Sequence, residues 1–383
     1  MHVPDQCPMD KTDPITRALQ AGVDGQAFPG AVLLVRSHGE IKYHQAVGLT
    51  SRSTLNHPTT LHTVYDLASL TKPLATGTAI LCLVQEGVLK IEQFIGSILQ
   101  ELHGSSIEHA TIRDLLCHRS GLPAWRPYYE RVVLQNGVLS KDTTRQARCH
   151  DVLRAIAQEP LEYQPRTKSV YSDLGFILLG LAIESVTQQS LSRYCAERIF
   201  HPLNARMLVF KEEVYDSSSH ERSLSDIVPT EQESWRGRLL QGEVHDGNAY
   251  VLGGVAGHAG LFGTTEAVSI ITKAWLDAYH WRDSLLDPAL VLQFTSRQGE
   301  PKDSSWALGW DTPSHPSSSG THFSPLAFGH LGFTGTSIWI DPEVELEVIL
   351  LTNRVHPTRE NNKIREFRPM IHDVVYDELL RKA

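Results

Sequence analysis

A serine and a lysine stand three residues apart in the stretch YDLASLTKPLATG, residues 65–77. Pro73 lacks an amide hydrogen and is tolerated near a helix start, so a helix over the apolar run that follows begins close to Ser69. Residues three apart share a helix face, which brings the Lys72 amine within reach of the Ser69 hydroxyl. The spacing therefore provides a nucleophile and a base, although it also fits a serine that caps a helix and a lysine in solvent. The apolar surroundings favour the chemical interpretation, because a solvated lysine is less expected there.

Hydrophobic periodicity and turn residues predict the elements that must hold this pair. A helix is expected over residues 13–27 and another over about 364–380. Two β-hairpins are expected, with strands at residues 31–36, 41–48, 336–341 and 346–353. We therefore predict an α/β fold of the α+β kind, in which one antiparallel sheet is formed from both termini and flanked by helices.

The middle of the chain carries apolar patterns typical of helices, such as ATGTAILCLVQEG and LGFILLGLAIESVTQ. These patterns predict a mostly helical subdomain over residues 76–249, inserted into an α/β subdomain made of residues 1–75 and 250–383. Two polar segments, 211–241 and 311–325, are expected to be long loops. Loops of this length either line a binding site or only cover surface.

Composition argues against some classes of protein. The 383 residues carry a formal charge of -9 without a basic stripe, so nucleic acid is not an expected partner. The sequence shows neither a secretory signal pattern nor about 18 uninterrupted apolar residues, so a cytoplasmic protein without a membrane partner is expected. The five cysteines are widely scattered, which predicts small buried residues rather than disulfides or a zinc site: Cys7, Cys82, Cys117, Cys149 and Cys195.

Further motifs accompany the S-x-x-K pattern. YSDLGFILLG contains Tyr171 and Asp173, GHLGFTGTSIWID contains His330 and Gly332, and LLCHRSGLPAW spans residues 115–125. In the order and spacing of these motifs, the chain resembles the serine hydrolases of the class C β-lactamase and penicillin-binding-protein superfamily. The motifs of that superfamily are S-x-x-K, Tyr-x-Asn and Lys-Thr-Gly. The resemblance covers almost the whole chain and favours a β-lactamase-related, esterase-like branch.

The resemblance implies roles for the matched residues. Ser69 would attack an ester or amide carbonyl to form an acyl-enzyme, and Lys72 and Tyr171 would share the proton transfer. The backbone amides of Ser69 and Phe333 would form the oxyanion hole, with Gly332 allowing close approach of the strand to the substrate. Tyr171 on its own fits a buried core tyrosine as well, but the accompanying motifs favour a catalytic role.

Two positions depart from the family pattern. Asp173 replaces an asparagine, so an amide donor becomes an acceptor-only carboxylate. Beside Lys72, this carboxylate favours the ammonium, unless Asp173 only caps the next helix. Tyr171 is then the expected base, because the nearby ammonium would stabilise its phenolate. His330 replaces a lysine that grips a substrate carboxylate, and its ordinary pKa near 6.5 predicts a mostly uncharged side chain at neutral pH.

Other residues are candidates for lining the site. His245 and His258 lie in the glycine-rich stretch VHDGNAYVLGGVAGHAG. Their spacing matches no common zinc motif, so we expect site-lining side chains there, with no metal and no other cofactor. Trp125, with Tyr128 and Tyr129, either forms an aromatic wall for an apolar acyl group or packs in the core.

The resemblance implies an enzyme, a serine hydrolase whose partner is a small-molecule ester or peptide substrate. The two departures together argue against efficient recognition of β-lactams or D-alanyl-D-alanine and in favour of esters or unusual peptides, so carboxylesterase-like activity is favoured. The alternatives are a D,D-carboxypeptidase or D-aminopeptidase that acts on cell-wall-derived peptides, or a weak β-lactamase. A catalytically silent binding protein is a further alternative, since a fold does not fix a function. The intact Ser69, Lys72 and Tyr171 set argues against it.

Overall fold

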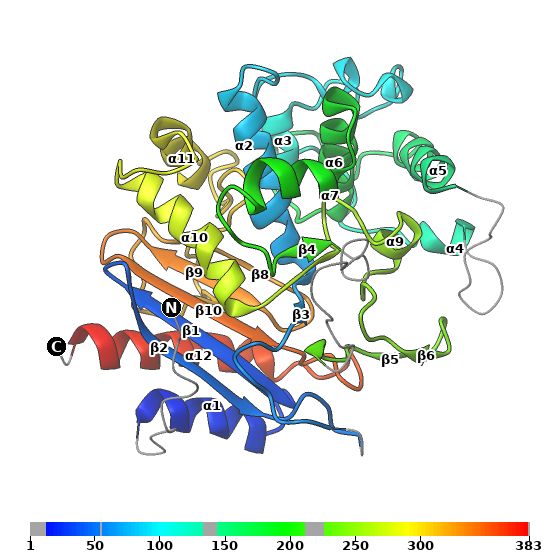
Figure 1. Cartoon of the computed structure of the whole chain (residues 1–383). Coiled ribbons are helices and arrows are strands. Elements are labelled where there is room, and N and C mark those ends of the chain that lie inside the picture. Colours follow the sequence, from blue (N-terminus) through cyan, green and yellow to red (C-terminus); the bar gives the residue numbers. More distant parts are fainter. Residues whose placement is uncertain (1–12, 54–55, 133–143, 211–225, 382–383) are drawn as a thin grey trace.

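The structure is a computed structural model that describes residues 13–53, 56–132, 144–210 and 226–381. At its centre lies a five-stranded sheet with strand order β2-β1-β10-β9-β8, in which every neighbouring pair is antiparallel. Both ends of the chain contribute to this sheet (Figure 1), which confirms the predicted fold class. Its strands are β1 (Gly30–Ser37), β2 (Glu40–Gly48), β8 (Phe328–Leu331), β9 (Ser337–Asp341) and β10 (Leu346–Thr352).

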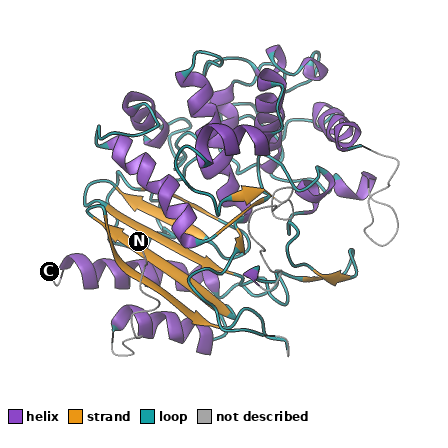
Figure 2. Cartoon of the chain, viewed as in Figure 1, coloured by secondary structure: helices purple, strands orange, loops and turns teal. Residues whose placement is uncertain are grey.

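The sheet separates two apolar cores. Along β1, Val32 and Leu34 belong to the larger core, whereas Leu33 and Val35 belong to the smaller one, as expected when side chains alternate between the faces of a strand. Helices α1 (Pro14–Asp24) and α12 (Ile364–Tyr376) cover the smaller core, and α12 continues into η8 (Asp377–Arg381). Helix α10 (Thr265–Tyr279) packs on the opposite face (Figure 2).

Most remaining helices stand on the side of the larger core (Figure 1). They are η3 (Ile95–Ser97), η4 (Gln100–Leu102), α3 (Ile112–Leu116), α4 (Tyr129–Val132), α5 (Arg145–Ala157), α6 (Asp173–Thr187), α7 (Leu191–Cys195), η6 (Ala196–Phe200), α9 (Gly247–Val251) and α11 (Pro288–Thr295). A three-stranded sheet has the order β3 (Tyr65–Asp66), β7 (Leu261–Gly263) and β4 (Val209–Phe210), and a short hairpin joins β5 (Gln232–Glu233) to β6 (Arg238–Leu239).

The helix expected after Ser69 is present, but it starts differently from a simple α-helix. The chain passes through the 3-10 turn η1 (Ala68–Leu70) and the π-helix η2 (Lys72–Gly77) before the α-helical segment α2 (Thr78–Gln85). Pro73 lies at the second position of η2. Irregular helical turns of this kind often occur at functional sites.

Other sequence predictions have clear outcomes. Both hairpins and both terminal helices are present close to their predicted bounds. Cys82, Cys117, Cys149 and Cys195 are buried as expected, while Cys7 lies outside the described residues. Residues 311–325 form a loop, and residues 226–241 contain the β5–β6 hairpin, whereas 211–225 lie outside the described part. The subdomain boundaries stay a prediction.

Within the described residues, no single helix has both the length and the apolar character needed to cross a membrane. Helix α6 and the segment Leu191–Phe200 meet those requirements only when they are taken together, and the chain bends by 76° between them.

Candidate active site

Ser69 lies in a tight turn directly after β3. Ala68, the residue before it, adopts a positive φ of 48°, which is unusual for a residue with a side chain. The buried Asp66 carboxylate holds this turn, because one oxygen accepts from the Ala68 amide at 2.8 Å and the other from the His245 amide at 2.7 Å. A strained residue persists only where its surroundings fix it, and such residues cluster at functional sites. The turn thus fixes the backbone that carries the Ser69 hydroxyl.

Lys72 is fully buried and contacts three oxygen atoms. Its Nζ donates to Ser69 Oγ at 3.0 Å, to Asp173 Oδ1 at 2.6 Å and to the His258 carbonyl at 3.3 Å. Burial by itself lowers the pKa of Lys72, but the Asp173 carboxylate and the Tyr171 hydroxyl outweigh it and raise the pKa above its ordinary value. The expected ammonium at this position therefore follows from the contacts.

Asp173 is the first residue of α6, and Ser172 before it is the N-cap, whose side chain accepts from the Gly175 amide. A serine in the cap position leaves the Asp173 carboxylate free to face Lys72. The Asp173 side chain remains 17% exposed, so it lies at the edge of the buried pair and within reach of a bound molecule. The alternative that Asp173 only caps the helix is wrong.

Tyr171 packs its ring against the same ammonium, 4.7 Å from Lys72 Nζ. Its other neighbours are the rings of His118 at 4.6 Å, Trp306 at 5.5 Å and His330 at 6.0 Å. Burial raises the pKa of the Tyr171 phenol, and the nearby Lys72 charge lowers it only in part. The Lys72 ammonium thus stabilises the phenolate as expected, but burial disfavours this charged form more, so Tyr171 keeps its proton in the resting protein.

His330 lies on β8 and is only 2% exposed. Its Nδ1 donates to the Leu331 carbonyl at 2.9 Å, and its ring lies 5.7 Å from that of Trp306. Burial, followed by the charge on Lys72, lowers the pKa of His330 to about 3. The side chain is therefore neutral at every physiological pH, so the titration near 6.5 that the sequence suggested does not apply.

The turn after β8 is bound to the segment that carries the nucleophile. Thr334 Oγ1 donates to the Asp66 carbonyl at 2.7 Å, and Thr336 Oγ1 donates to the Leu67 carbonyl at 3.1 Å. A Cβ at Gly332 would lie 1.9 Å from Thr336 Oγ1 and 2.7 Å from the Leu67 carbonyl oxygen. The glycine thus permits close approach between two parts of the protein, in addition to the approach to a substrate that the sequence suggested.

Phe333 follows this glycine and is about half exposed. Its ring stacks on the His245 ring at 5.5 Å, and the Arg354 guanidinium lies 4.5 Å from its centre. In the described residues, the amides of Ser69 and Phe333 donate to no backbone carbonyl. Neither amide is therefore committed to a backbone carbonyl there, as the predicted oxyanion hole requires.

The two histidines predicted to line the site, His245 and His258, each pair with a carboxylate next to it. His258 is buried, and its Nε2 lies 2.7 Å from Asp246 Oδ1, while its carbonyl accepts from Lys72. His245 is also buried, and its Nε2 lies 2.8 Å from Glu231 Oε2. Each is held by one carboxylate, and no cluster of three or more metal-ligating side chains is found across the described residues.

The predicted aromatic residues divide between wall and core. Trp125 is 42% exposed and directly follows the residue whose carbonyl accepts from the Asp173 amide at 2.9 Å. Its ring lies 6.3 Å from Tyr129, which stacks on Trp235 at 4.6 Å. Tyr128 is buried in the core. An aromatic surface therefore begins next to Asp173 and includes one residue, Trp235, that the sequence did not single out.

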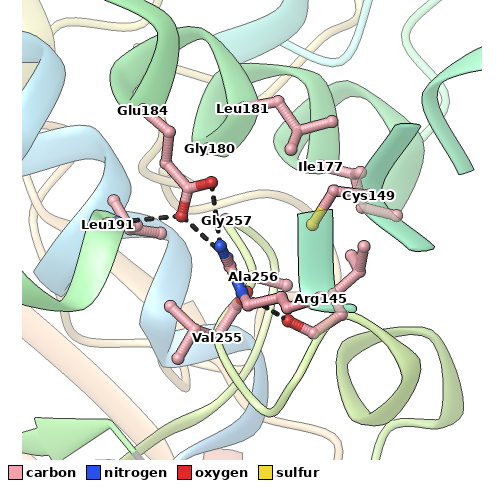
Figure 3. A pocket seen from close by; sticks show the side chains of 11 residues that line it. Arg145, Cys149, Ile177, Gly180, Leu181, Glu184, Leu191, Val255, Ala256 and Gly257 are labelled. Carbon is pink, nitrogen blue, oxygen red and sulfur yellow. Dashed lines mark hydrogen bonds and ion pairs between the residues drawn. The ribbon is translucent and has the colours of Figure 1, made fainter. Parts of the chain in front are cut away.

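A small cavity lies between α5, α6 and residues 255–257, the segment that precedes His258 (Figure 3). Arg145 borders it and pairs with Glu184 at 2.7 Å, and the same guanidinium donates to the carbonyls of Leu252 and Val255. The cavity measures about 10 Å³, which is room for about one water molecule. The cavity is too small for a substrate. The contacts of Arg145 hold the loop that precedes His258.

Several residues of the site were not found from the sequence. Asp66 had a visible signal, because an acidic residue in an apolar segment three positions before a candidate nucleophile invites a role. Trp306 and Arg368 had none, because their contacts with His330 and with the Gly332 turn depend on packing between distant parts of the chain.

Comparisons with known proteins identify the family. The Beta-lactamase family model matches residues 15–368. A protein from Salmonella gallinarum named "Putative D-alanyl-D-alanine carboxypeptidase" is 33% identical over 389 aligned positions, covering 94% of this chain and 87% of that protein.

Solved structures share the fold at lower identity. EstCE1, described as a hydrolase with promiscuous acyltransferase activity, has a TM-score of 0.72 at 20% identity and covers 95% of this chain and 98% of its own. A penicillin-binding-protein homologue from Caulobacter crescentus has a TM-score of 0.72 at 17% identity and covers 99% and 100%. The chain thus belongs to the beta-lactamase family and is a serine hydrolase.

Proposed function

We propose that the protein hydrolyses the ester bond of a small carboxylic ester through an acyl-enzyme on Ser69. The observation that carries this proposal is the 3.0 Å contact between Ser69 Oγ and the fully buried Lys72 Nζ. A lysine held by a carboxylate inside the protein and directed at one serine is a recognisable arrangement for nucleophilic catalysis.

In the proposed reaction, Ser69 Oγ forms a bond to the ester carbonyl carbon, and its proton passes to Lys72 or Tyr171. The carbonyl oxygen gains a negative charge, and the amides of Ser69 and Phe333 would stabilise it by donating hydrogen bonds to it. The alkoxide leaves as an alcohol after it takes up a proton, and water then cleaves the acyl-enzyme to a carboxylic acid. The pKa values of Lys72 and Tyr171 are both raised, so both groups hold their protons at neutral pH. Either group therefore acts as a base only after it has lost its own proton.

The neutral His330 supports esters as substrates. A buried imidazole that donates to its neighbour's carbonyl offers no positive charge to a substrate carboxylate. Asp173 adds an acceptor-only group at the edge of the same site, which further disfavours an anionic substrate nearby. The exposed Trp125 provides an apolar surface suited to an acyl group.

A D,D-carboxypeptidase is the second candidate. It is supported by the 33% identical relative whose name describes that activity. A D-aminopeptidase and a weak β-lactamase share the same acyl-enzyme chemistry. The substrates of these three activities carry charged groups that a simple ester lacks. A comparison of turnover between an ester and such a charged substrate therefore distinguishes the candidates.

Labelling and turnover together test the proposal. A fluorophosphonate should add one label mass to the wild-type protein and none to Ser69→Ala, and p-nitrophenyl butyrate should turn over faster than a peptide ending in D-alanyl-D-alanine. Faster release of D-alanine would favour the carboxypeptidase. Absence of both label and turnover would favour the silent binding protein. The cytoplasmic location, and the absence of nucleic-acid and membrane partners, stay predictions.

A further inference from the structure

Arg368 is a buried cation on α12, only 7% exposed. Its Nη2 donates to the Gly332 carbonyl at 2.8 Å and to the Thr336 carbonyl at 2.7 Å, while its Nε has no partner. Within the described residues, no carboxylate forms an ion pair with it, and the charged groups that influence it are Arg354 and Arg365. A buried charge without a counter-charge is costly, so its presence calls for a physical reason.

The protonation state of Arg368 follows from these neighbours. Burial, followed by repulsion from Arg354 and Arg365, lowers the pKa of Arg368 to about 9. That value is still above neutral pH, so the guanidinium keeps its positive charge under physiological conditions. The charge therefore lies directly behind the turn that contains Gly332 and Phe333.

The contact with the Gly332 carbonyl has a consequence for the next residue. The C=O of Gly332 and the N–H of Phe333 belong to the same peptide group, which is planar and conjugated. A cation that donates to the oxygen draws electron density from the nitrogen, so the N–H becomes a stronger donor. The Gly335 amide also donates to the Gly332 oxygen, at 3.1 Å, and adds to this polarisation.

We propose that Arg368 is a positioning residue that polarises the Gly332–Phe333 peptide group and so strengthens the Phe333 amide as an oxyanion donor. The inference rests on the proposed acyl-enzyme function. Arg368 does not touch the substrate, because one peptide group separates them. The negative oxygen that forms during the reaction provides the counter-charge that the resting protein lacks, which lowers the energy of the transition state more than that of the bound substrate.

The geometry around Arg368 fixes this contact. Thr334 and Thr336 bind the turn to the carbonyls of Asp66 and Leu67, so the Phe333 amide keeps its place relative to Ser69. The guanidinium cannot follow a moving turn, because α12 is packed in the smaller core. A fixed donor costs no reorganisation when the oxyanion forms.

The main variant is Arg368→Met, which removes the charge and keeps much of the volume. Each carbonyl that loses Arg368 keeps another donor, since Gly335 N donates to Gly332 O and Gly332 N donates to Thr336 O. The variant should therefore fold, as is common when a buried charge is replaced by an apolar side chain. Arg368→Gln is a second neutral variant, and the exposed Arg365→Gln on the same helix is the control for lost charge.

The first measurement is the acylation rate with p-nitrophenyl butyrate. Both neutral variants at position 368 should acylate about tenfold more slowly with little change in KM, which is less than the 10²–10³ that removal of an oxyanion donor costs. Arg365→Gln should acylate like the wild type. Equal acylation by wild type and both neutral variants would overturn the proposal.

The second measurement does not need activity. The exchange rate of the Phe333 amide with solvent reports the acidity of its N–H, and selective ¹⁵N-phenylalanine labelling limits the spectrum to the 11 phenylalanines, with Phe333→Leu to assign the signal. Loss of polarisation should slow exchange of this amide severalfold, whereas mere loosening of the turn would speed it. Unchanged or faster exchange in Arg368→Met contradicts the proposal. This result stands even if the wild type shows no ester turnover, which would count against the proposed function alone.

Discussion

The two sides of the proposed active site treat charge in opposite ways. On the side of η2 and α6, the Lys72 ammonium meets the Asp173 carboxylate at 2.6 Å, so a positive and a negative charge cancel inside the protein. On the side of β8, His330 is neutral. The positive charge of Arg368 contacts the Gly332 carbonyl and has no carboxylate partner in the described residues.

The difference indicates where each side acts in the reaction. A compensated pair holds the groups next to the nucleophile in fixed positions for the proton transfer. An uncompensated cation favours whatever state brings a negative charge nearby, and in the proposed reaction that state is the tetrahedral intermediate rather than the bound ester. Under the proposed function, the balanced side thus serves the nucleophile and the unbalanced side serves the oxyanion.

The largest effect is expected from Ser69→Ala, which removes the proposed nucleophile, Ser69 Oγ. Turnover of p-nitrophenyl butyrate should fall by several orders of magnitude, because no acyl-enzyme can form. Circular dichroism should show an unchanged fold. Ser296→Ala, at an exposed serine of the chain, is the matched control and should keep wild-type activity. Substantial turnover by Ser69→Ala would mean that another residue is the nucleophile.

The next effect tests the balanced side directly. Lys72→Met should slow acylation by about 10²–10⁴, the range for loss of a positioned acid or base. It should also lower the melting temperature, since the partly buried Asp173 carboxylate loses its partner. The exposed Lys90→Met is the control.

Combining Lys72→Met with Asp173→Asn separates these two effects. The double variant should regain melting temperature, because no unpaired charge remains, but it should not regain activity. Recovery of activity in the double variant would show that Lys72 only neutralises Asp173 and takes no part in the chemistry.

Local patterns were enough to predict much of this molecule. Strand alternation and turn residues located both hairpins, and the three-residue spacing placed Lys72 against Ser69. The Asp173 contact with Lys72 was also expected, from the match to a family motif. Each of these features depends on short spacings along the chain or on a motif with a fixed place in the fold.

Burial and long-range packing account for what the sequence did not provide. The types of His330 and Tyr171 suggested a titrating imidazole and a stabilised phenolate, but packing against Trp306 and its neighbours makes desolvation the larger influence on both pKa values. The contact between Arg368 and the Gly332 turn joins residues 36 positions apart. No local pattern signals that a helix near the end of the chain contacts this turn.

A smaller effect is expected from Asp173→Asn, which makes the balanced side positive. Removal of the carboxylate takes away the main charge that raises the pKa of Lys72, so more of the free amine is available as a base. An asparagine also donates a hydrogen bond to a substrate carbonyl. The acylation rate with a β-lactam, relative to that with an ester, should rise about tenfold, as one charge-assisted contact would give.

Stopped-flow acylation with one β-lactam and one ester measures this ratio. Asp287→Asn, at the N-cap of α11, is the control because asparagine serves as well as aspartate in a cap. An unchanged ratio in Asp173→Asn would show that the carboxylate does not control Lys72, and the balanced pair would lose its proposed role.

The smallest effect expected is from His330→Asn, on the side of β8. Asparagine does not titrate, and its amide replaces the Nδ1 donor to the Leu331 carbonyl. Because the pKa of His330 lies at about 3, the imidazole stays neutral as the pH falls from 8 to 5, and it gains a proton only below that range. The ester turnover of wild type and His330→Asn should therefore follow parallel pH profiles over pH 5–8 and differ by less than about twofold, since both side chains are uncharged throughout. A step near pH 6.5 that is present in the wild type and absent in the variant would show that His330 titrates in the working protein. His330 would then be positively charged at acid pH. The described contrast between a neutral His330 and the Lys72–Asp173 ion pair would hold only above that pH.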